Sequence, residues 1–501
     1  MVQGSSSSAG KTLLVTALCR IYARRGLRVA PFKAQNMSNN SAVCLSGGEI
    51  GRAQALQASA AGIEPMVEMN PVLIKPEADA FSQVILNGSP WKRLSARDYY
   101  KHKDFLWGQV TRALDKLKDQ YDLIVIEGAG SPAELNLLPG DIVNMAIARY
   151  IQSPVILIGD IDRGGIFAQL LGTLWLLEPE ERALVCGLAV NKFRGDPGLF
   201  TEGVKILEEK GGIPVVGVIP YLKNLYLPEE DAVAIDVQPQ IDENIVSELD
   251  IAVVRLPHIS NFDDFDPLKM ETGVRLRFVQ SREMFGNPDA VILPGSKSTA
   301  SDLDWLRQVG LAGAISEFAN SGGCVVGLCG GYQMLGEKIL DSGHLETAND
   351  ISLGLGLLEG VTEFHPEKMT RQTTAVVEGG KNWLKDLHGL ELHGYEIHQG
   401  DTQSKSGWLR IVERNKKRVS QIDGAVSSDG RIWGSYLHGI FGNDRFRRAW
   451  LKSLGWNNSE EINSRRLIEE SINRLADSVE SSLNMEMLDR IIWENDQDTP
   501  G

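Results

Sequence analysis

Short apolar runs alternate with helix-like stretches through the first half of the chain. Runs rich in β-branched residues occur at 28–32, 123–127, 155–159 and 185–191. Between them, the stretches 12–25, 51–61 and 104–118 have the apolar spacing of helices. Strands that alternate with helices are typical of a parallel sheet. We therefore predict an α/β domain here.

A second α/β pattern follows a stretch at 227–244 that is poor in apolar residues and rich in Asp, Glu, Pro and Gln. Its expected strands lie at 251–256, 290–293 and 324–328, and more follow at 373–377, 408–412 and 432–436. We also expect a helix at 332–339. These patterns divide the chain into a first domain (1–235), a linker (236–249) and a second domain (250–445).

Residues 446–501 form a helical C-terminal extension in this scheme. Ile468, Ile472, Leu475 and Val479 share one helical face, and the other face is acidic and polar. A membrane-surface helix would carry Lys and Arg on its polar face. The pattern therefore predicts a helix that docks on the rest of the protein.

Composition narrows the functional classes. The 501 residues carry 51 basic and 66 acidic side chains, a net charge of −15, which disfavours nucleic acid and anionic membranes as partners. Five cysteines without a C-x-x-C pair argue against a disulfide framework and a structural metal. No apolar run reaches the roughly 18–20 residues of a membrane span. The N-terminus is not a signal peptide, so we expect a cytoplasmic protein.

A glycine- and serine-rich loop at 4–12 ends in Gly10-Lys11-Thr12 and opens the first expected helix. Bare N–H groups at such a helix start bind phosphate, the lysine reaches the β- and γ-phosphates, and the threonine hydroxyl binds Mg²⁺. The usual spacing requires glycine at position 5, where this chain has Ser5. We predict an ATP site, and since only three residues precede the loop, we expect either a very short first strand or a truncated start.

Two acidic residues stand directly after apolar runs. Glu127 follows 123–126, and Asp160 follows 155–159. Ligands bind at the carboxyl ends of strands in open parallel sheets. We predict that Glu127 and Asp160 hold or orient Mg²⁺ near the phosphates. The alternative is that one of them only caps a helix.

A cysteine lies in a strand-to-helix turn at 327–331, with glycine on both sides nearby. Cys329 follows the run 324–328, as a nucleophile does in an elbow, whereas Cys324 lies inside that run. A helix start favours the thiolate, and the backbone N–H of Gly330 can stabilise an oxyanion. The Pro-Gly turn at Gly295 is the expected second oxyanion donor.

The cysteine needs a base, and eight histidines are available. His438 follows an expected strand and precedes a glycine, and His398 stands in a second candidate segment. Catalytic partners meet in space, so the spacing along the chain does not decide between them. From the residues alone, both histidines stay candidates.

Six segments together resemble the cobyric acid synthase family. They lie at 2–4, 31–37, 69–76, 127–134, 160–165 and 394–398, and the resemblance covers at least 2–445. It implies a dethiobiotin-synthetase-like P-loop domain with a parallel sheet, followed by a flavodoxin-like class I glutamine amidotransferase domain. It also implies Cys329 as the nucleophile and His438 as its base. We take Gln35, Asn36 and Asp141 as possible substrate-site residues.

The resemblance further implies a reaction. The b, d, e and g carboxylates of adenosylcobyrinic acid a,c-diamide would be amidated, each with one ATP and one L-glutamine. Carboxylates are poor acyl donors, so ATP would form an acyl phosphate, and Cys329 would release ammonia from glutamine through a thioester. The rival enzymes amidate the a,c positions or a cell-wall precursor. A rival of another class is a partition-type ATPase with an inactive amidotransferase scaffold.

The orientation of the base is a separate expectation. Class I amidotransferases often have a glutamate two residues after the histidine, but this chain has Ile440 there. We therefore expect a Cys329–His438 dyad. The group that orients the histidine would come from elsewhere, with a backbone carbonyl, a water molecule and Glu396 as candidates.

Overall fold

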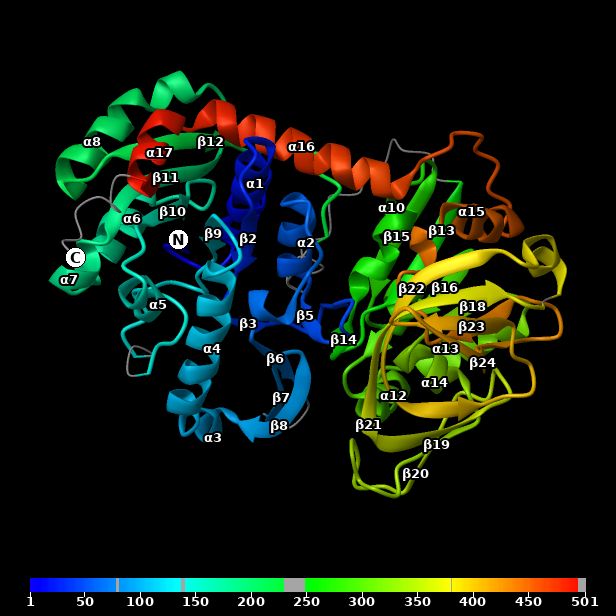
Figure 1. Ribbon diagram of the computed structural model, residues 1–501. Helices are drawn as coiled ribbons and strands as arrows, with labels where there is room; N and C mark the ends of the chain where they lie inside the picture. The colour runs from blue at the N-terminus through cyan, green and yellow to red at the C-terminus, as the bar shows by residue number, and fades with distance from the viewer. Residues whose placement is uncertain (78–80, 137–139, 229–247, 380, 494–501) are drawn as a thin grey trace.

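The protein has two α/β bodies that lie side by side, joined across the top of Figure 1 by a long helix. The computed structural model describes residues 1–77, 81–136, 140–228, 248–379 and 381–493. Within these residues, no helix combines the length and apolarity that crossing a bilayer requires. The predicted linker at 236–249 lies, up to residue 247, outside the described part of the chain.

The first body contains the predicted parallel sheet. Its strands are β1 (Val2–Gly4), β10 (Val155–Asp160), β11 (Val185–Phe193) and β12 (Val215–Pro220), in that spatial order. β2 (Val29–Phe32) pairs with β9 (Leu123–Ile126), and a bridge from Val2 to Glu127 joins this pair to β1. The very short first strand that the sequence predicted is therefore a real strand, paired in parallel with β10.

Helices cover this sheet on both faces, with one apolar core on each side. They are α1 (Lys11–Arg24), α2 (Arg52–Ala60), α4 (Lys103–Lys118), α5 (Met145–Tyr150), α6 (Ile166–Leu176), α7 (Pro179–Arg182) and α8 (Thr201–Gly211). The apolar core includes residues from α1, β1, β9 and β10. Because β1, β10, β11 and β12 are parallel, their carboxyl ends lie at one edge of the sheet, and the phosphate loop follows β1 there.

A small second sheet in the first body was not predicted. Its strands are β3 (Gln35–Met37), β6 (Val72–Pro76), β7 (Phe81–Leu86) and β8 (Ser89–Ser95), and α3 (Ala96–Tyr100) follows. β4 (Ser41–Val43) and β5 (Glu49–Gly51) pair beside it. Asn87 and Gly88 make the β7–β8 turn with positive φ, which an Asn-Gly pair favours.

Among the described residues, the second body contains two six-stranded sheets and one two-stranded pair. The first has the order β15 (Val274–Val279), β13 (Leu249–Val254), β16 (Ala290–Leu293), β18 (Cys324–Leu328), β26 (Ile432–Ser435), β25 (Ala425–Val426). The second comprises β19 (Lys338–Leu340), β20 (Ile351–Leu353), β21 (Val361–Val377), β22 (Glu391–Gln403), β23 (Leu409–Arg414) and β24 (Lys417–Asp423). β14 (Ile259–Ser260) pairs with β17 (Gly295–Ser296).

The helices of the second body are α10 (Asp266–Lys269), α11 (Arg282–Phe285), α12 (Thr299–Gln308), α13 (Leu311–Asn320), α14 (Gly330–Leu335) and α15 (Asp444–Ser453). The helix expected at 332–339 is wrong in its second half. It ends before Gly336, whose backbone is extended and passes close to the Gly360 carbonyl, and the chain continues as β19.

The C-terminal helices return to the first body. α16 (Ser464–Ser482) lies across α1, and α17 (Met485–Trp493) lies near β12 (Figure 1). The face predicted to dock is buried in the core of the first body, with Ile472, Leu475 and Val479 among its residues. Ion pairs from Arg24 to Asp477 and from Arg25 to Glu480 flank this contact.

Candidate active sites

The turn after β18 holds the cysteine in a strained conformation. Cys329 has φ 52° and ψ −112°, a region that a non-glycine residue rarely adopts. Gly331 lets the turn pack, because a Cβ there would lie 2.0 Å from the carbonyl oxygen of Leu293. The Cys329 side chain is buried, and its Sγ lies 3.3 Å from the carbonyl oxygen of Ile397. The local fold is that of a nucleophile elbow.

His438 is the histidine that the fold brings to this cysteine. It follows β26, the parallel neighbour of β18, and it lies close enough to Cys329 for the cysteine to raise its pKa. Burial by itself lowers the pKa of His438, but the charges of Asp264 and Cys329 and hydrogen bonds to both raise it to about 10. This electrostatic balance favours an imidazolium beside the cysteine sulfur.

Asp264 orients the histidine. Its Oδ2 lies 2.6 Å from His438 Nδ1, and its Oδ1 accepts a hydrogen bond of 2.7 Å from the Gly439 N–H. Both side chains are buried. With Nδ1 held by a carboxylate, Nε2 is the ring nitrogen available to the cysteine. The structure thus contains a Cys329–His438–Asp264 arrangement rather than a dyad.

The nominated candidates for this orienting role were wrong. Glu396 instead accepts hydrogen bonds from Thr373 and Arg414 and lies 3.5 Å from the Nε2 atom of His398. Sequence reasoning missed Asp264 because it lies 174 residues before His438 in a segment without a recognisable motif. Only the packing of η3 (Phe262–Phe265) against the turn after β26 brings them together.

His398 occupies a different position. Its Nδ1 lies 2.9 Å from the carbonyl oxygen of Gly400, and its ring stacks on Tyr436 at 3.9 Å between centroids. It lines the same cavity as Cys329, described below. These contacts place His398 in the wall of the site, whereas His438 is the histidine whose pKa Cys329 raises.

The predicted oxyanion loop lies against the elbow. A Cβ on Gly330 would be 2.9 Å from the Ser296 nitrogen, and one on Gly295 would be 3.2 Å from His438 Cε1. β14 pairs with β17 and fixes the loop beside the histidine. The backbone around Gly295 and Gly330 therefore borders the space next to Cys329.

A cavity of about 40 Å³ opens at Cys329 and reaches the other domain. Gln333, Glu346, His398, Lys368 and Lys75 are among its walls, and Lys75 comes from the first body. This volume holds a few water molecules, so the entry of an amino acid requires the lining side chains to rearrange. The wall of the cysteine site is thus shared between the two domains.

The phosphate loop lies at the edge of the first sheet. Gly10 has φ 101°, and a Cβ there would clash with the Asn191 amide at 1.9 Å. Lys11 Nζ donates hydrogen bonds to the carbonyl oxygens of Ser6, at 3.0 Å, and Gly130, at 2.9 Å. Its ammonium group is therefore held across the loop, where β- and γ-phosphates bind in P-loop proteins.

Glu127 sits directly beside the loop threonine. Its Oε1 accepts hydrogen bonds of 2.9 Å from the Thr12 hydroxyl and from Lys33 Nζ, and its Oε2 accepts one from Gln57. Burial by itself raises the pKa of Glu127, but Lys33, Gln57 and Lys11 lower it overall. An ionised carboxylate next to a threonine hydroxyl is a donor pair that suits Mg²⁺. The described residues contain no cluster of three or more His, Cys, Asp or Glu side chains that could hold a metal.

Asp160 ends β10 next to the loop. Its Oδ2 lies 2.8 Å from Lys192 Nζ and its Oδ1 accepts a bond of 3.0 Å from the Asp162 N–H. Lys192 also donates to the Ser8 carbonyl, at 2.8 Å. Asp160 therefore fixes Lys192 against the phosphate loop, in addition to shaping the turn that follows β10.

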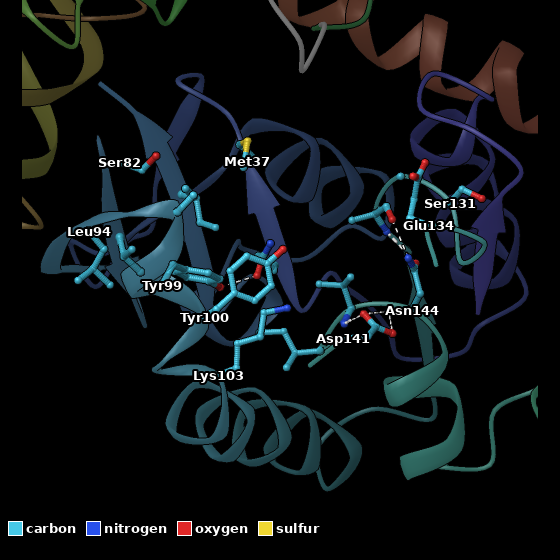
Figure 2. Close-up of a pocket in the computed structure, with 18 of the residues that line it drawn as sticks. Met37, Ser82, Leu94, Tyr99, Tyr100, Lys103, Ser131, Glu134, Asp141 and Asn144 are labelled. Carbon is cyan, nitrogen blue, oxygen red and sulfur yellow. Dashed lines mark hydrogen bonds between the residues drawn. The ribbon is translucent and has the colours of Figure 1, made fainter. Parts of the chain in front are cut away.

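A larger cavity of about 400 Å³ lies in the first body (Figure 2). Tyr99, Tyr100 and Lys103 point into it from one side, and Asp141 and Asn144 lie on another (Figure 2). Gly130, whose carbonyl accepts from Lys11, is part of its wall. The cavity is in the size range of small-molecule sites. The wall of this cavity at Gly130 is therefore in contact with the lysine of the phosphate loop.

Two of the three predicted substrate-site residues line this cavity. Gln35 does so and accepts a hydrogen bond from the Tyr99 hydroxyl, and Asp141 does so while it caps backbone N–H groups of 143–146. Asn36 is turned away and hydrogen-bonds to Gln54 at 3.2 Å. Neighbouring residues on β3 face opposite sides, so Gln35 and Asn36 are separated by the strand.

The small sheet of the first body stands between the two cavities. Ile74 and Lys75 are neighbours on β6; Ile74 lines the 400 Å³ cavity and Lys75 lines the 40 Å³ cavity at Cys329. Contacts near this sheet join the domains, including the Arg52–Asp263 ion pair at 3.0 Å and Lys297–Glu77 at 2.6 Å.

Comparison with known proteins divides the chain in two. Residues 1–235 match the CobQ/CobB/MinD/ParA nucleotide binding domain, and residues 250–446 match the CobB/CobQ-like glutamine amidotransferase domain. These matches confirm the predicted fold class. The chain is 54% identical to "Cobyric acid synthase" of Chloroflexus aurantiacus over 98% of each chain. The proteins of that name from Roseiflexus castenholzii (54%, 92% of this chain and 93% of that one) and Herpetosiphon aurantiacus (48%, 99% of each) are also similar.

Proposed function

The chain belongs to the cobyric acid synthase family, and from that premise we propose that it is a glutamine-hydrolysing amide ligase. Its substrates are the b, d, e and g side-chain carboxylates of adenosylcobyrinic acid a,c-diamide. One observation carries the proposal. A single chain holds the Cys329–His438–Asp264 centre and a cavity of about 400 Å³ on the other side of the small sheet of the first body. The wall of this cavity contacts Lys11 of the phosphate loop through the Gly130 carbonyl.

The cysteine centre supplies ammonia. Cys329 attacks the side-chain carbonyl of glutamine, and the oxyanion lies against the backbone near Gly330 and Gly295. The imidazolium of His438 gives its proton to the departing amide nitrogen, so ammonia leaves and a thioester remains. His438 then takes a proton from water, which hydrolyses the thioester to glutamate. Asp264 keeps the ring in the required orientation throughout.

The phosphate loop activates the carboxylate. The carboxylate oxygen attacks the γ-phosphate of ATP, which forms an acyl phosphate and releases ADP. Lys11 neutralises charge on the transferred group. Thr12 and Glu127 would hold Mg²⁺, which supplies further charge neutralisation when bound. Ammonia then attacks the acyl carbon and phosphate leaves, so each amide consumes one ATP and one glutamine.

The shape of the larger cavity suits one carboxylate arm at a time. A tetrapyrrole-derived macrocycle with several arms is too large for a cavity of about 400 Å³, but a single arm fits beside Gly130. Lys103 and the Tyr99 and Tyr100 hydroxyls line this space and can hold the carboxylate before transfer. Repeated binding with a different arm inserted accounts for four amidations in one site.

One experiment tests the function directly. The purified protein is incubated with adenosylcobyrinic acid a,c-diamide, ATP, Mg²⁺ and glutamine, and the corrinoid is analysed by mass spectrometry. We expect four successive mass decreases of about 1 Da, since each step replaces OH by NH₂. Parallel incubations contain cobyrinic acid or a cell-wall precursor. Conversion of either of these in place of the diamide would refute the assigned substrate.

A further inference from the structure

A buried cluster of charges joins the two domains at the cysteine site. Glu49 of β5 lies between two lysines: Lys75 of β6 contacts its Oε1, and Lys368 of β21 donates to its Oε2 at 2.7 Å. The Ser41 hydroxyl also donates to Glu49, at 2.7 Å, and accepts from Lys75 at 2.9 Å. All three ionisable side chains are at least nine-tenths buried. We call Glu49, Lys75 and Lys368 the interdomain triad.

The triad has one more positive charge than negative charge. Two ammonium groups share a single carboxylate, and buried charges ordinarily need a counter-charge. Among the described residues, Lys368 donates a hydrogen bond to Glu49 alone, although an ammonium group has three donors. The third lysine of the cavity wall, Lys297, is paired with Glu77 at 2.6 Å. The triad therefore has both charge and donors left for an anion.

Both lysines of the triad line the cavity that opens at Cys329. A carboxylate, Glu346, lines the same cavity, and burial raises its pKa to about 7. The Cys329 sulfur, the two lysine ammonium groups and the Glu346 carboxyl group therefore border the same cavity. The backbone end of free glutamine carries an α-carboxylate, opposite in charge to the two lysines, and an α-ammonium group, opposite in charge to Glu346 when that carboxyl is ionised.

We propose that Lys75, contributed by the synthetase domain, and Lys368 together bind the α-carboxylate of glutamine in the amidotransferase pocket. The glutamine site is then complete only where the two domains meet. This inference rests on the proposed glutamine hydrolysis at Cys329. Lys75 belongs to the segment 69–76, and neither the cysteine chemistry nor the phosphate-loop chemistry otherwise gives this lysine a role.

The position of Lys75 also links the two reaction sites. Its neighbour Ile74 lines the cavity proposed for the carboxylate arm, and β6 carries both side chains. A shift of β6 on binding of the arm would move the Lys75 ammonium group. Glutamine binding is therefore set partly by the domain that uses the ammonia.

The test compares Lys75→Met and Lys368→Met with the unmodified protein. Each substitution leaves Glu49 its other lysine, so no buried carboxylate is left without a partner. Glutaminase kinetics are measured with L-glutamine and with L-glutamine α-amide, which lacks the α-carboxylate. Gln372→Ala is the matched control, because Gln372 bonds across the interface to the Val43 carbonyl but does not line the cavity.

We expect each lysine variant to raise KM for L-glutamine by about tenfold to a hundredfold, with kcat much less changed. Turnover of the α-amide should be poor in the unmodified protein and no poorer in the variants. Ammonia-dependent amidation should persist, which shows that the variants are folded, and Lys75→Arg should recover part of the affinity. The Gln372 variant should keep its KM.

Equal losses with both substrates, or an unchanged KM for L-glutamine in both lysine variants, would overturn the assignment. If Lys75→Met does not fold, Lys368→Met and Lys75→Arg decide the question by the same two KM values. Absence of any glutaminase activity in the unmodified protein would instead refute the proposed function, so the two failures are distinguishable.

Discussion

The two reaction centres differ in how much of their chemistry the chain assembles by itself. At the cysteine centre, the base already bonds to its orienting carboxylate beside the nucleophile, and all three side chains are buried. At the phosphate loop, Lys11 donates to backbone carbonyls and Thr12 to Glu127, positions that phosphate oxygens and Mg²⁺ would take over in the proposed complex with ATP. One centre is complete without its substrate, and the other is organised around ligands.

This contrast follows from the two chemistries. In the proposed chemistry, thioester formation needs a proton passed from the histidine to the departing amide nitrogen, and the protein groups must be aligned before glutamine arrives. Phosphoryl transfer depends mainly on positioning and charge neutralisation, to which the nucleotide and the metal contribute. The two centres should therefore respond to substitutions independently, and the predictions below separate them.

The largest expected effect is that of Cys329→Ser on glutamine-dependent synthesis. Loss of a nucleophile that acts together with its base costs on the order of 10⁶-fold in rate. Synthesis with ammonia at high pH should survive, because the phosphate loop is untouched. The measurement is amide formation with each nitrogen donor. A folded variant that loses both activities equally would show that the two halves are not separable.

His438→Ala should lower glutamine hydrolysis by about 10²–10⁴-fold, the usual contribution of a positioned general base. Ammonia-dependent amidation should continue at its normal rate. His398→Ala is the control, since His398 lines the cavity but bonds to the Gly400 carbonyl. Loss of hydrolysis in the His398 variant with retention in the His438 variant would reverse the assignment.

Lys11→Ala should lower amide formation by about 10²–10³-fold with either nitrogen donor, as expected when one electrostatic contact to a transition state is lost. Glutaminase activity should remain at least in part, because Lys11 lies in the other domain. Product amide and glutamate are quantified in the same reaction. Normal turnover with ammonia would mean that the loop at 4–12 is not the ATP site.

Asp264→Asn should reduce glutamine hydrolysis by roughly 10²-fold, since the histidine loses its orienting carboxylate. It should also change stability with pH. The pKa of His438 is raised to about 10 from its usual value near 6.5. The stabilisation is therefore full below about pH 6.5 and is lost as the pH rises through 10.

Denaturant unfolding of the Asp264 variant and the unmodified protein measures this difference. We expect a loss of about 3 kcal/mol at pH 6 and a smaller loss toward pH 10. Asp263→Asn provides a neighbouring control, because Asp263 pairs with Arg52 rather than with His438. A loss that grows with pH would contradict the raised pKa of His438.

The smallest expected effect on rate comes from the C-terminal helix. Ile472 is buried between α16 and the first body, so Ile472→Ala should lower stability by about 2–5 kcal/mol. Amide formation should fail at a lower temperature than glutamine hydrolysis, because α16 packs on the first body, which holds the phosphate loop. Thermal inactivation of both activities is the measurement. Loss of both at the same temperature would show that the two domains unfold together.

The sequence by itself determined the parallel sheet of the first body and the two reactive loops. Periodicity and glycine placement are local properties, and the short runs around Gly10 and Cys329 carry them completely. The docking face of α16 was equally readable from Ile472, Leu475 and Val479. Its partner, however, was not: α16 packs on the domain at the opposite end of the chain.

Only the tertiary structure decided the groups that act across long separations. Asp264 reaches His438 over 174 residues, and Lys75 meets Lys368 through Glu49 across the domain interface. Neither contact leaves a pattern in the sequence, because the sequence does not distinguish a buried carboxylate or lysine from an exposed one. Burial changes the pKa values of these groups and strengthens the interactions between them. Burial is a property of the packed fold rather than of the local chain.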